Sequence, residues 1–287
     1  MKHSRGWTNH QGRSPRQAIT ECKQSCKAEI RRDIAQTATL TWERIRDLSR
    51  GSRIATDQSL PSSVRHQPRS LFESFPGVYA FWREHLFQDH TEVISRWLWK
   101  DHPAAETKLL EVGCGPGFYS CRLALRFPQL EVTGIDRSIK LLRRARTRAA
   151  SHSLKNCRFI RADFLSLDLF SDSFDAVVAS RIFTIAGRRE VALGELHRTL
   201  KSGGRCFVAE PRSIMRAAIP LSVLWLMARV MGSFGLAADS YCEPARAVAL
   251  SEAEFRAPIA SQLWESTQVW NDRYYHYAVC QKPKWDA

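Results

Sequence analysis

Two short motifs, a glycine-rich turn and an isolated acid, constrain the fold of this chain more than any other feature. The first is LLEVGCGPG at residues 109–117, an apolar run that breaks into alternating glycines. Such a run predicts a buried strand that ends in a tight turn, where missing Cβ atoms let a ligand lie on the backbone. The second is VTGID at residues 132–136, whose Asp136 ends another apolar strand 23 positions after Gly113. That separation places a carboxylate beside a ribose diol, so we expect a cofactor that contains a nucleoside.

The spacing of the glycines narrows the choice of cofactor. A dinucleotide-binding turn has its third glycine at the position of Phe118, whereas here the third glycine is Gly117. A loop that cradles a nucleoside triphosphate ends in Gly-Lys-Ser/Thr, and no lysine lies between Lys108 and Lys140. Dinucleotides and nucleoside triphosphates are therefore disfavoured.

The motifs resemble those of the class I S-adenosylmethionine-dependent methyltransferases, in particular the ubiquinone/menaquinone-biosynthesis-like (type 11) branch. The resemblance extends over residues 105–287: CRFIRADF at 157–164, SFDAVVAS at 173–180 and LKSGGRCFVAEP at 200–211 are similar to later segments of the family. Four motifs in the family's order are much more specific than a glycine turn alone. The resemblance implies an α/β, Rossmann-like, doubly wound, seven-stranded and mostly parallel sheet, with a C-terminal antiparallel hairpin, N-terminal helices and an inserted apolar helix.

The same resemblance implies which residues bind ligands. Family members use acids like Asp136 and Asp163 for the ribose and the adenine amino group, a residue like Phe164 for the adenine ring, and Glu111 near the cofactor's amino group. The implied S-adenosyl-L-methionine-binding set is Glu111, Gly113, Cys114, Gly115, Gly117, Asp136, Arg137, Asp163, Phe164 and Ser180. The implied substrate-binding residues are Tyr79, Trp82 and Arg181. These residues also have purely structural interpretations, which stay open. Asp136 could be the N-cap of a helix at 138–150, Phe164 could belong to the apolar core, and the aromatic stripe at 79–82 could cover the sheet.

The chemistry of methyl transfer does not demand a dedicated catalytic residue. In-line displacement at a sulfonium depends on aligning the nucleophile and excluding water. An oxygen or activated-carbon nucleophile needs a general base, and the available side chains are His85, His90, His197, His276 and Tyr79. Residues 179–182, ASRI, lack the Asn/Asp-Pro-Pro-Tyr/Phe pattern of enzymes that methylate nucleic-acid amino groups, and the Pro-Cys of cytosine carbon methylation. The branch that the chain resembles then favours a small, apolar or aromatic acceptor.

The positive net charge is also compatible with an anionic partner, such as RNA or a membrane. The chain has 43 Lys and Arg against 29 Asp and Glu, a net charge of +14. A predicted helix at 137–148 carries six cations, which favours RNA methylation as an alternative function. An anionic membrane is another candidate partner, because the apolar stretch 214–236 contains two arginines and a proline and therefore predicts a lid or surface-docking helix rather than a spanning one. A non-catalytic sensor or assembly protein that binds S-adenosylmethionine is a further alternative, since it would need the same turn.

Composition divides the chain into a basic, partly helical extension at 1–70 and a methyltransferase domain at 71–287, with a lid-like insertion at about 212–250. The extension holds 14 Lys and Arg against 6 Asp and Glu, and a helix is predicted from Pro15. Periodicity at 76–100 predicts one helix, Ser251 and Glu254 form a capping box, and 268–270 and 274–280 predict the hairpin. No secretory signal is recognised and the eight cysteines are scattered, so we expect a cytoplasmic protein without a metal.

Overall fold

The computed structural model describes residues 71–100, 102–165, 167, 170–233 and 249–284, with only the backbone at 214–218. Two predictions therefore lie outside the described residues. One is the basic extension at 1–70 with its helix from Pro15, and the other is the part of the insertion at 234–248. The remainder contains all the predicted site residues.

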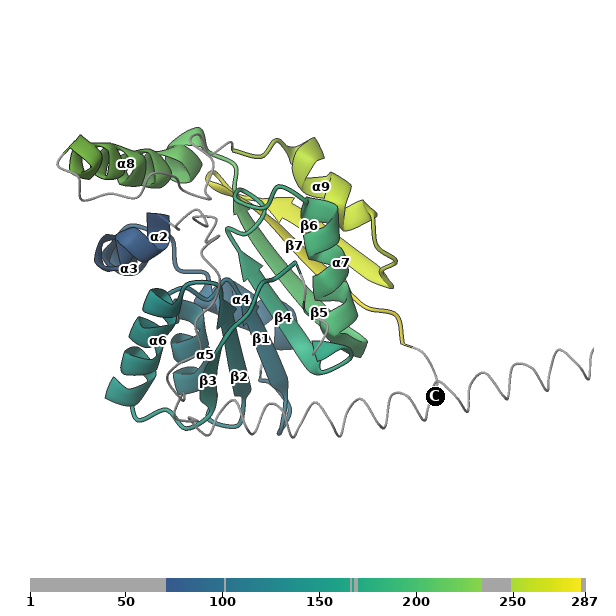
Figure 1. Ribbon diagram of the computed structural model, residues 1–287. Coiled ribbons are helices and arrows are strands. Elements are labelled where there is room, and N and C mark those ends of the chain that lie inside the picture. Colours follow the sequence, from purple (N-terminus) through teal and green to yellow (C-terminus); the bar gives the residue numbers. More distant parts are fainter. Residues whose placement is uncertain (1–70, 101, 166, 168–169, 234–248, 285–287) are drawn as a thin grey trace, which may run out of the picture. The chain divides into compact units, whose positions relative to one another are not determined.

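Seven strands form one sheet in the order β3-β2-β1-β4-β5-β7-β6 (Figure 1). They are β1 (Lys108–Val112), β2 (Glu131–Asp136), β3 (Cys157–Arg161), β4 (Phe174–Ser180), β5 (Leu200–Pro211), β6 (Ser266–Asn271) and β7 (Tyr275–Gln281). The first five pair in parallel, whereas β7 is antiparallel to both β5 and β6. The predicted fold class is confirmed, including the hairpin. Because β1 pairs with both β2 and β4, the strand order reverses beside β1, where doubly wound sheets bind ligands at their carboxyl ends.

Helices cover both faces of the sheet (Figure 1). One face carries α4 (Thr91–Trp99), α5 (Phe118–Arg126) and α6 (Ile139–Ser151), and the other carries α7 (Arg189–Thr199) and α9 (Glu252–Ala260). Leu98 and Leu123 belong to the apolar core on the first face, and Leu196 and Phe255 to the core on the second. Burial on both faces explains why the parallel strands read as continuous apolar runs.

The stretch at 76–100 forms two helices, so the prediction of a single helix was wrong. Helix α3 (Pro76–His85) follows the short α2 (Leu71–Ser74), and α4 begins only at Thr91. The break has a local cause, because Asp89 Oδ1 accepts hydrogen bonds from the backbone N and the hydroxyl of Thr91. His90 is the N-cap of α4, so Asp89 accepts from the first N–H group of the helix from the position before the cap.

Helix α8 (Ile214–Ser233) lies in the segment predicted to be an insertion and packs on α2 and α3. The shared apolar cluster consists of Leu71, Phe75, Leu221, Leu224 and Ala228. After the insertion, Ser251 caps α9 in the predicted capping box, with Ser251 and Glu254 each bonding the backbone of the other. The short-range capping signal was therefore sufficient to locate this helix.

Candidate active site

The glycine turn after β1 has the geometry that the sequence predicts. Gly113, Gly115 and Gly117 have φ angles of 65°, 53° and 73°, in the left-handed region that residues with a Cβ avoid. A Cβ on Gly117 would lie 2.8 Å from the Cβ of Ala145, and one on Gly115 would lie 3.2 Å from the ring of Tyr79. Gly117 is also the N-cap of α5. The turn thus leads its backbone directly into the first N–H groups of a helix at the carboxyl end of β1.

Asp136 ends β2 and holds the glycine turn. Its Oδ2 accepts a hydrogen bond from Gly115 N at 2.9 Å, and its Oδ1 accepts one from Ser138 N at 2.8 Å. Helix α6 is capped by Ser138, whose hydroxyl accepts from Leu141 N, so the N-cap interpretation of Asp136 was wrong. Burial raises the pKa of Asp136, while the two N–H donors lower it. Each oxygen keeps a second acceptor position, so the carboxylate can hold the turn and also accept from a ribose hydroxyl.

Glu111 lies in the middle of β1 and is 4% exposed. Its Oε2 accepts hydrogen bonds from the backbone N of Ser120, at 2.6 Å, and from the Ser120 hydroxyl. Burial raises the pKa of Glu111 to about 7, against the opposing effects of Ser120 and Arg83. The donor that a buried carboxylate requires is therefore supplied by α5. The contact near the cofactor's amino group stays a prediction.

The loop after β3 brings Asp163 to the same edge of the sheet. Asp163 Oδ2 lies 3.7 Å from Arg137 Nε, and its Oδ1 accepts from Leu165 N at 3.0 Å. Because Arg137 follows Asp136, this pair links the ends of β2 and β3. Phe164 packs against the core on the α7 side of the sheet, as its structural interpretation expects. Its stacking on adenine stays a prediction.

The end of β4 carries Ser180 and Arg181, which lie beside aromatic side chains. Burial raises the pKa of the Tyr119 phenol to about 12, and the Ser180 side chain opposes this shift. The Arg181 guanidinium lies 4.3 Å from the ring centre of Phe87 and donates to Tyr275 Oη at 3.3 Å. Arg181 itself has a φ of 61°, a left-handed conformation that non-glycine residues rarely adopt. Such backbone strain is concentrated at ligand sites in many proteins.

Helix α3 covers the glycine turn with Tyr79 and Arg83, which lie one turn apart. Tyr79 lies over Gly115, and burial raises the pKa of its phenol. Arg83 is 7% exposed and stacks on the rings of Phe118 and Tyr119 at 4.0 and 4.3 Å. Sequence reasoning missed Arg83, although its spacing of four from Tyr79 predicted a shared helix face. Within the described ranges, no carboxylate is close enough to Arg83 for an ion pair.

Trp82, by contrast, is not brought to the turn. It packs in the apolar cluster between α2, α3 and α8. Tyr79 and Arg181 are therefore the two predicted substrate contacts that lie at the carboxyl edge of the sheet.

Glu210 is a second residue that sequence reasoning missed. It lies near the end of β5 and is fully buried. Its Oε1 accepts from Ile182 N at 2.6 Å and Phe183 N at 2.8 Å, and its Oε2 accepts from Thr184 N at 3.2 Å. Burial raises the pKa of Glu210 to about 7 against these donors. Glu210 therefore fixes the backbone that follows Arg181, and the only sequence signal was an acid inside an apolar strand.

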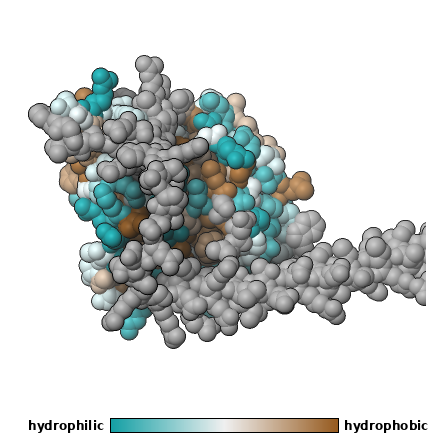
Figure 2. All heavy atoms as spheres, viewed as in Figure 1, coloured by the Kyte–Doolittle hydropathy of each residue, from teal (hydrophilic) through white to brown (hydrophobic). Residues whose placement is uncertain are grey.

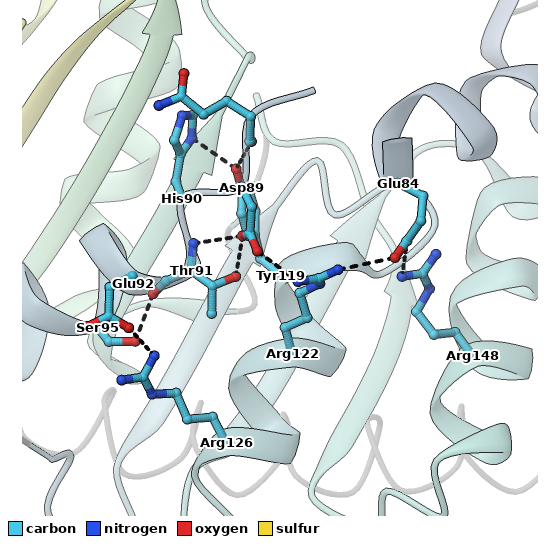
Figure 3. Close-up of polar contacts among 11 residues, drawn as sticks. Glu84, Asp89, His90, Thr91, Glu92, Ser95, Tyr119, Arg122, Arg126 and Arg148 are labelled. Carbon is cyan, nitrogen blue, oxygen red and sulfur yellow. Dashed lines mark hydrogen bonds and ion pairs between the residues drawn. The ribbon is translucent and has the colours of Figure 1, made fainter. Parts of the chain in front are cut away.

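Ion pairs attach α3 and the α3–α4 connection to the helices that follow the glycine turn (Figure 3). Arg122 of α5 pairs with Glu84 at 3.2 Å and with Asp89 at 2.7 Å. Arg148 of α6 pairs with Glu84 at 2.6 Å. Each exposed pair contributes little stability by itself. As a connected set they fix the position of α3 over the turn.

A buried histidine, His90, follows Asp89 of this ion-pair network in the chain. His90 Nδ1 is 2.9 Å from Tyr119 Oη, and Figure 3 shows the two side chains joined at the start of α4. Burial lowers the pKa of His90 to about 3, so its ring is neutral. A base with so low a pKa is poorly matched to proton abstraction at neutral pH. His90 therefore serves as support for Tyr119.

A shallow cavity of about 450 Å³, largely open to solvent, lies beside Phe87. It is lined by Leu86, Phe87 and Gln88 of the α3–α4 connection and by Asp272, Arg273 and Tyr274 of the β6–β7 turn. Gln88 Nε2 donates to Asp272 Oδ2 at 3.2 Å, which joins the two walls. The volume lies within the range of small-molecule sites.

Comparisons with known sequences identify the domain. A model of the methyltransferase domain matches residues 103–276, more than half of the chain. The demethylmenaquinone methyltransferase of Thermus thermophilus is 38% identical over 106 residues, which cover 37% of this chain and 48% of that protein. The malonyl-[acyl-carrier protein] O-methyltransferase of a Paenibacillus species is 32% identical over 103 residues, or 35% and 37% of the two chains. The match thus spans less than half the length of either relative.

Solved structures share the fold. A putative S-adenosyl-L-methionine-dependent methyltransferase from Methanococcus maripaludis aligns with a TM-score of 0.55 and 13% identity, over 82% of this chain and 99% of that one. The [4+2]-cyclase SpnF also aligns with a TM-score of 0.55, with 16% identity over 78% and 100% of the two chains. Identities this low support the fold alone. On the domain match and the motifs, the chain belongs to the methyltransferase-domain family, among the class I S-adenosylmethionine-dependent methyltransferases.

Proposed function

We propose that this protein transfers a methyl group from S-adenosylmethionine to an oxygen or carbon atom of a small, apolar or aromatic acceptor. One observation carries the proposal: the glycine turn, Asp136 and Asp163 meet at the carboxyl ends of three adjacent parallel strands, next to Ser180 on a fourth. The names of the two sequence relatives describe methylation of a quinone precursor and of a carried malonyl group. Both are compatible with a small acceptor.

The residues at this edge fit S-adenosylmethionine. The glycines leave the backbone of the turn without side chains, so a nucleoside can lie directly against it. Asp136 can accept from the ribose diol, and Asp163 can accept from the adenine amino group. The buried Arg83 forms no ion pair in the described part of the chain, although its charge acts on Glu111, and the methionine end of the cofactor has a carboxylate. We therefore assign Arg83 to that carboxylate. When bound, the cofactor supplies a methyl group on a positively charged sulfur.

The protein's own residues orient the acceptor and exclude water. Tyr79 and Arg83 of α3 cover the glycine turn, while Glu210 fixes the backbone after Arg181. The cavity beside Phe87 is the acceptor pocket in this proposal, since Phe87 stacks under Arg181 at the end of β4. A flat ring beside a cation suits a planar acceptor with negative charge on or near the reacting oxygen. Alignment of that atom with the methyl group is the main contribution of the protein to the rate.

The RNA alternative is weakened by the contacts of the basic helix. Arg146 donates to Phe159 O at 2.8 Å, and Arg148 pairs with Glu84. Arg137 also pairs with Asp163, so three of the six cations at 137–148 form contacts within the chain. Where grey residues do not cover this face, Figure 2 shows hydrophilic and hydrophobic side chains interspersed. A phosphate-binding surface is expected to be more continuously basic.

The test uses cofactor labelled on its methyl group. The full chain is incubated with it and a cell extract, and released S-adenosylhomocysteine is measured. The products are then divided by ribonuclease treatment and by extraction into an organic solvent. We expect the label to enter the organic phase and to be unaffected by ribonuclease, and we expect less label with the Asp136→Ala variant at the same cofactor concentration. Label that ribonuclease solubilises would support RNA methylation, and cofactor binding without release of S-adenosylhomocysteine would support a sensor.

A further inference from the structure

Helix α8 has apolar side chains on two opposite faces. The inward face is Leu221, Leu224 and Ala228, which are at most 4% exposed and pack on α2 and α3. The outward face is Ile219, Leu226 and Val230, which are 49%, 60% and 52% exposed. Spacings of seven and four residues return to the same side of a helix, so these three form one continuous stripe, here called the outer stripe. A surface helix normally carries polar residues there, and the outer stripe therefore needs an apolar environment.

The charges around the outer stripe identify the kind of surface that it fits. Helix α8 contains two arginines and no acid, and Arg229, next to Val230 of the outer stripe, is exposed. Helices α2 and α3 pack on the inner face of α8, and α6 lies beyond them, so the cations of α6 are not part of this surface (Figure 1). An apolar stripe on a helix that carries basic and no acidic residues is the pattern of helices that lie on anionic membranes.

We propose that the outer stripe docks α8 onto an anionic phospholipid surface. The helix lies in the plane of the interface, since in the described part of the chain no helix is long and apolar enough to cross a bilayer. The outer stripe enters the boundary between headgroups and acyl chains, and the exposed Arg229 contacts the headgroups. On its inner face α8 packs against α3, the helix that places Tyr79 over the glycine turn. Docking would thus place the site beside the source of a lipid-soluble acceptor.

Vesicle co-sedimentation of the full chain tests the proposal without cofactor or acceptor, so its outcome does not depend on the proposed methyl transfer. Vesicles contain either phosphatidylcholine alone or equal parts of phosphatidylcholine and phosphatidylglycerol. The test variant is Leu226→Glu/Val230→Glu. The control is Val191→Glu/Leu263→Glu, which changes two exposed aliphatic residues, 37% and 80% exposed, outside α8. Circular dichroism melts establish that both variants fold.

We expect the wild-type chain and the control to bind the anionic vesicles equally, and the α8 variant to partition about tenfold less. Some wild-type binding should persist at high salt, because burial of apolar side chains is not screened. Equal partition of the two variants, or no wild-type binding, would overturn the proposal. So would light scattering that shows a wild-type dimer converted to a monomer by the α8 variant, because the outer stripe would then bind a second copy of the chain.

Discussion

The two sides of the candidate site differ in how far along the chain their contacts reach. On the cofactor side, Gly115 N reaches Asp136 across 21 positions and Ser120 N reaches Glu111 across 9. On the acceptor side, Arg181 reaches Tyr275 across 94 positions and Gln88 reaches Asp272 across 184. The cofactor side can therefore be encoded in short motifs. The acceptor side exists only after β5, β7 and α3 have been assembled.

The largest effect is expected from Gly117→Val, which tests whether the turn is set by local backbone geometry. A β-branched residue at φ 73°, with a Cβ 2.8 Å from Ala145, combines backbone strain with overpacking. We expect a loss of about 4 kcal/mol in the free energy of unfolding. Urea denaturation measures it, with Gly187→Val as the control, since a Cβ at Gly187 would have no neighbour within 4 Å. Equal losses in the two variants would show that the turn imposes no special constraint.

The next effect concerns the pH dependence of stability through Glu111. The pKa of Glu111 is about 7 in the folded chain, against an ordinary value of 4.5. Protonation of Glu111 therefore favours the folded state. This contribution to the free energy of unfolding is fully present below pH 4.5 and is lost as the pH rises through 7. A glutamine at position 111 does not titrate, and its side-chain oxygen can still accept a hydrogen bond from Ser120. Relative to Glu111→Gln, the wild-type chain should lose on the order of 3 kcal/mol of unfolding free energy across that window. Urea titrations across that pH range measure the difference, and parallel profiles would contradict it.

A smaller effect is expected for Asp136→Ala, which sharpens the cofactor side of the comparison. Removal of the carboxylate leaves Gly115 N without its acceptor and takes away the proposed ribose contact. We expect S-adenosylhomocysteine to bind about 1 to 3 kcal/mol more weakly. Isothermal titration calorimetry measures this, and unchanged affinity would sink the ribose assignment.

The smallest effect tests whether α3, an element outside the glycine motif, completes the cofactor site. Arg83→Met should weaken binding of S-adenosylhomocysteine by about tenfold, or about 1.4 kcal/mol, through loss of the carboxylate contact. Methylthioadenosine lacks that carboxylate, and its affinity should not change. Arg143→Met, at an exposed position of α6, is the matched control. Equal weakening of both ligands by Arg83→Met would indicate a structural role in place of the proposed contact.

The sequence predicted most of the fold because its signals act over short distances. The glycine turn, the apolar parallel strands, the capping box at Ser251 and the final hairpin were all readable from local pattern. It failed at the break between α3 and α4, where one helical periodicity runs through 76–100 although Asp89 starts a second helix. It also misassigned the cap of α6, because Asp136 and Ser138 are both acceptors two residues apart.

By itself, the sequence determined the turn and the acids at the strand ends, because left-handed glycines and alternating strands and helices follow from local sterics and pattern. Only the tertiary structure decided that Arg83 lies buried over the turn, that Trp82 faces α8, and that Glu210 holds the backbone after β4. An Arg, a Trp or a Glu has no preference of its own for these places. Their roles arise from burial and charge that exist only once distant segments have packed together.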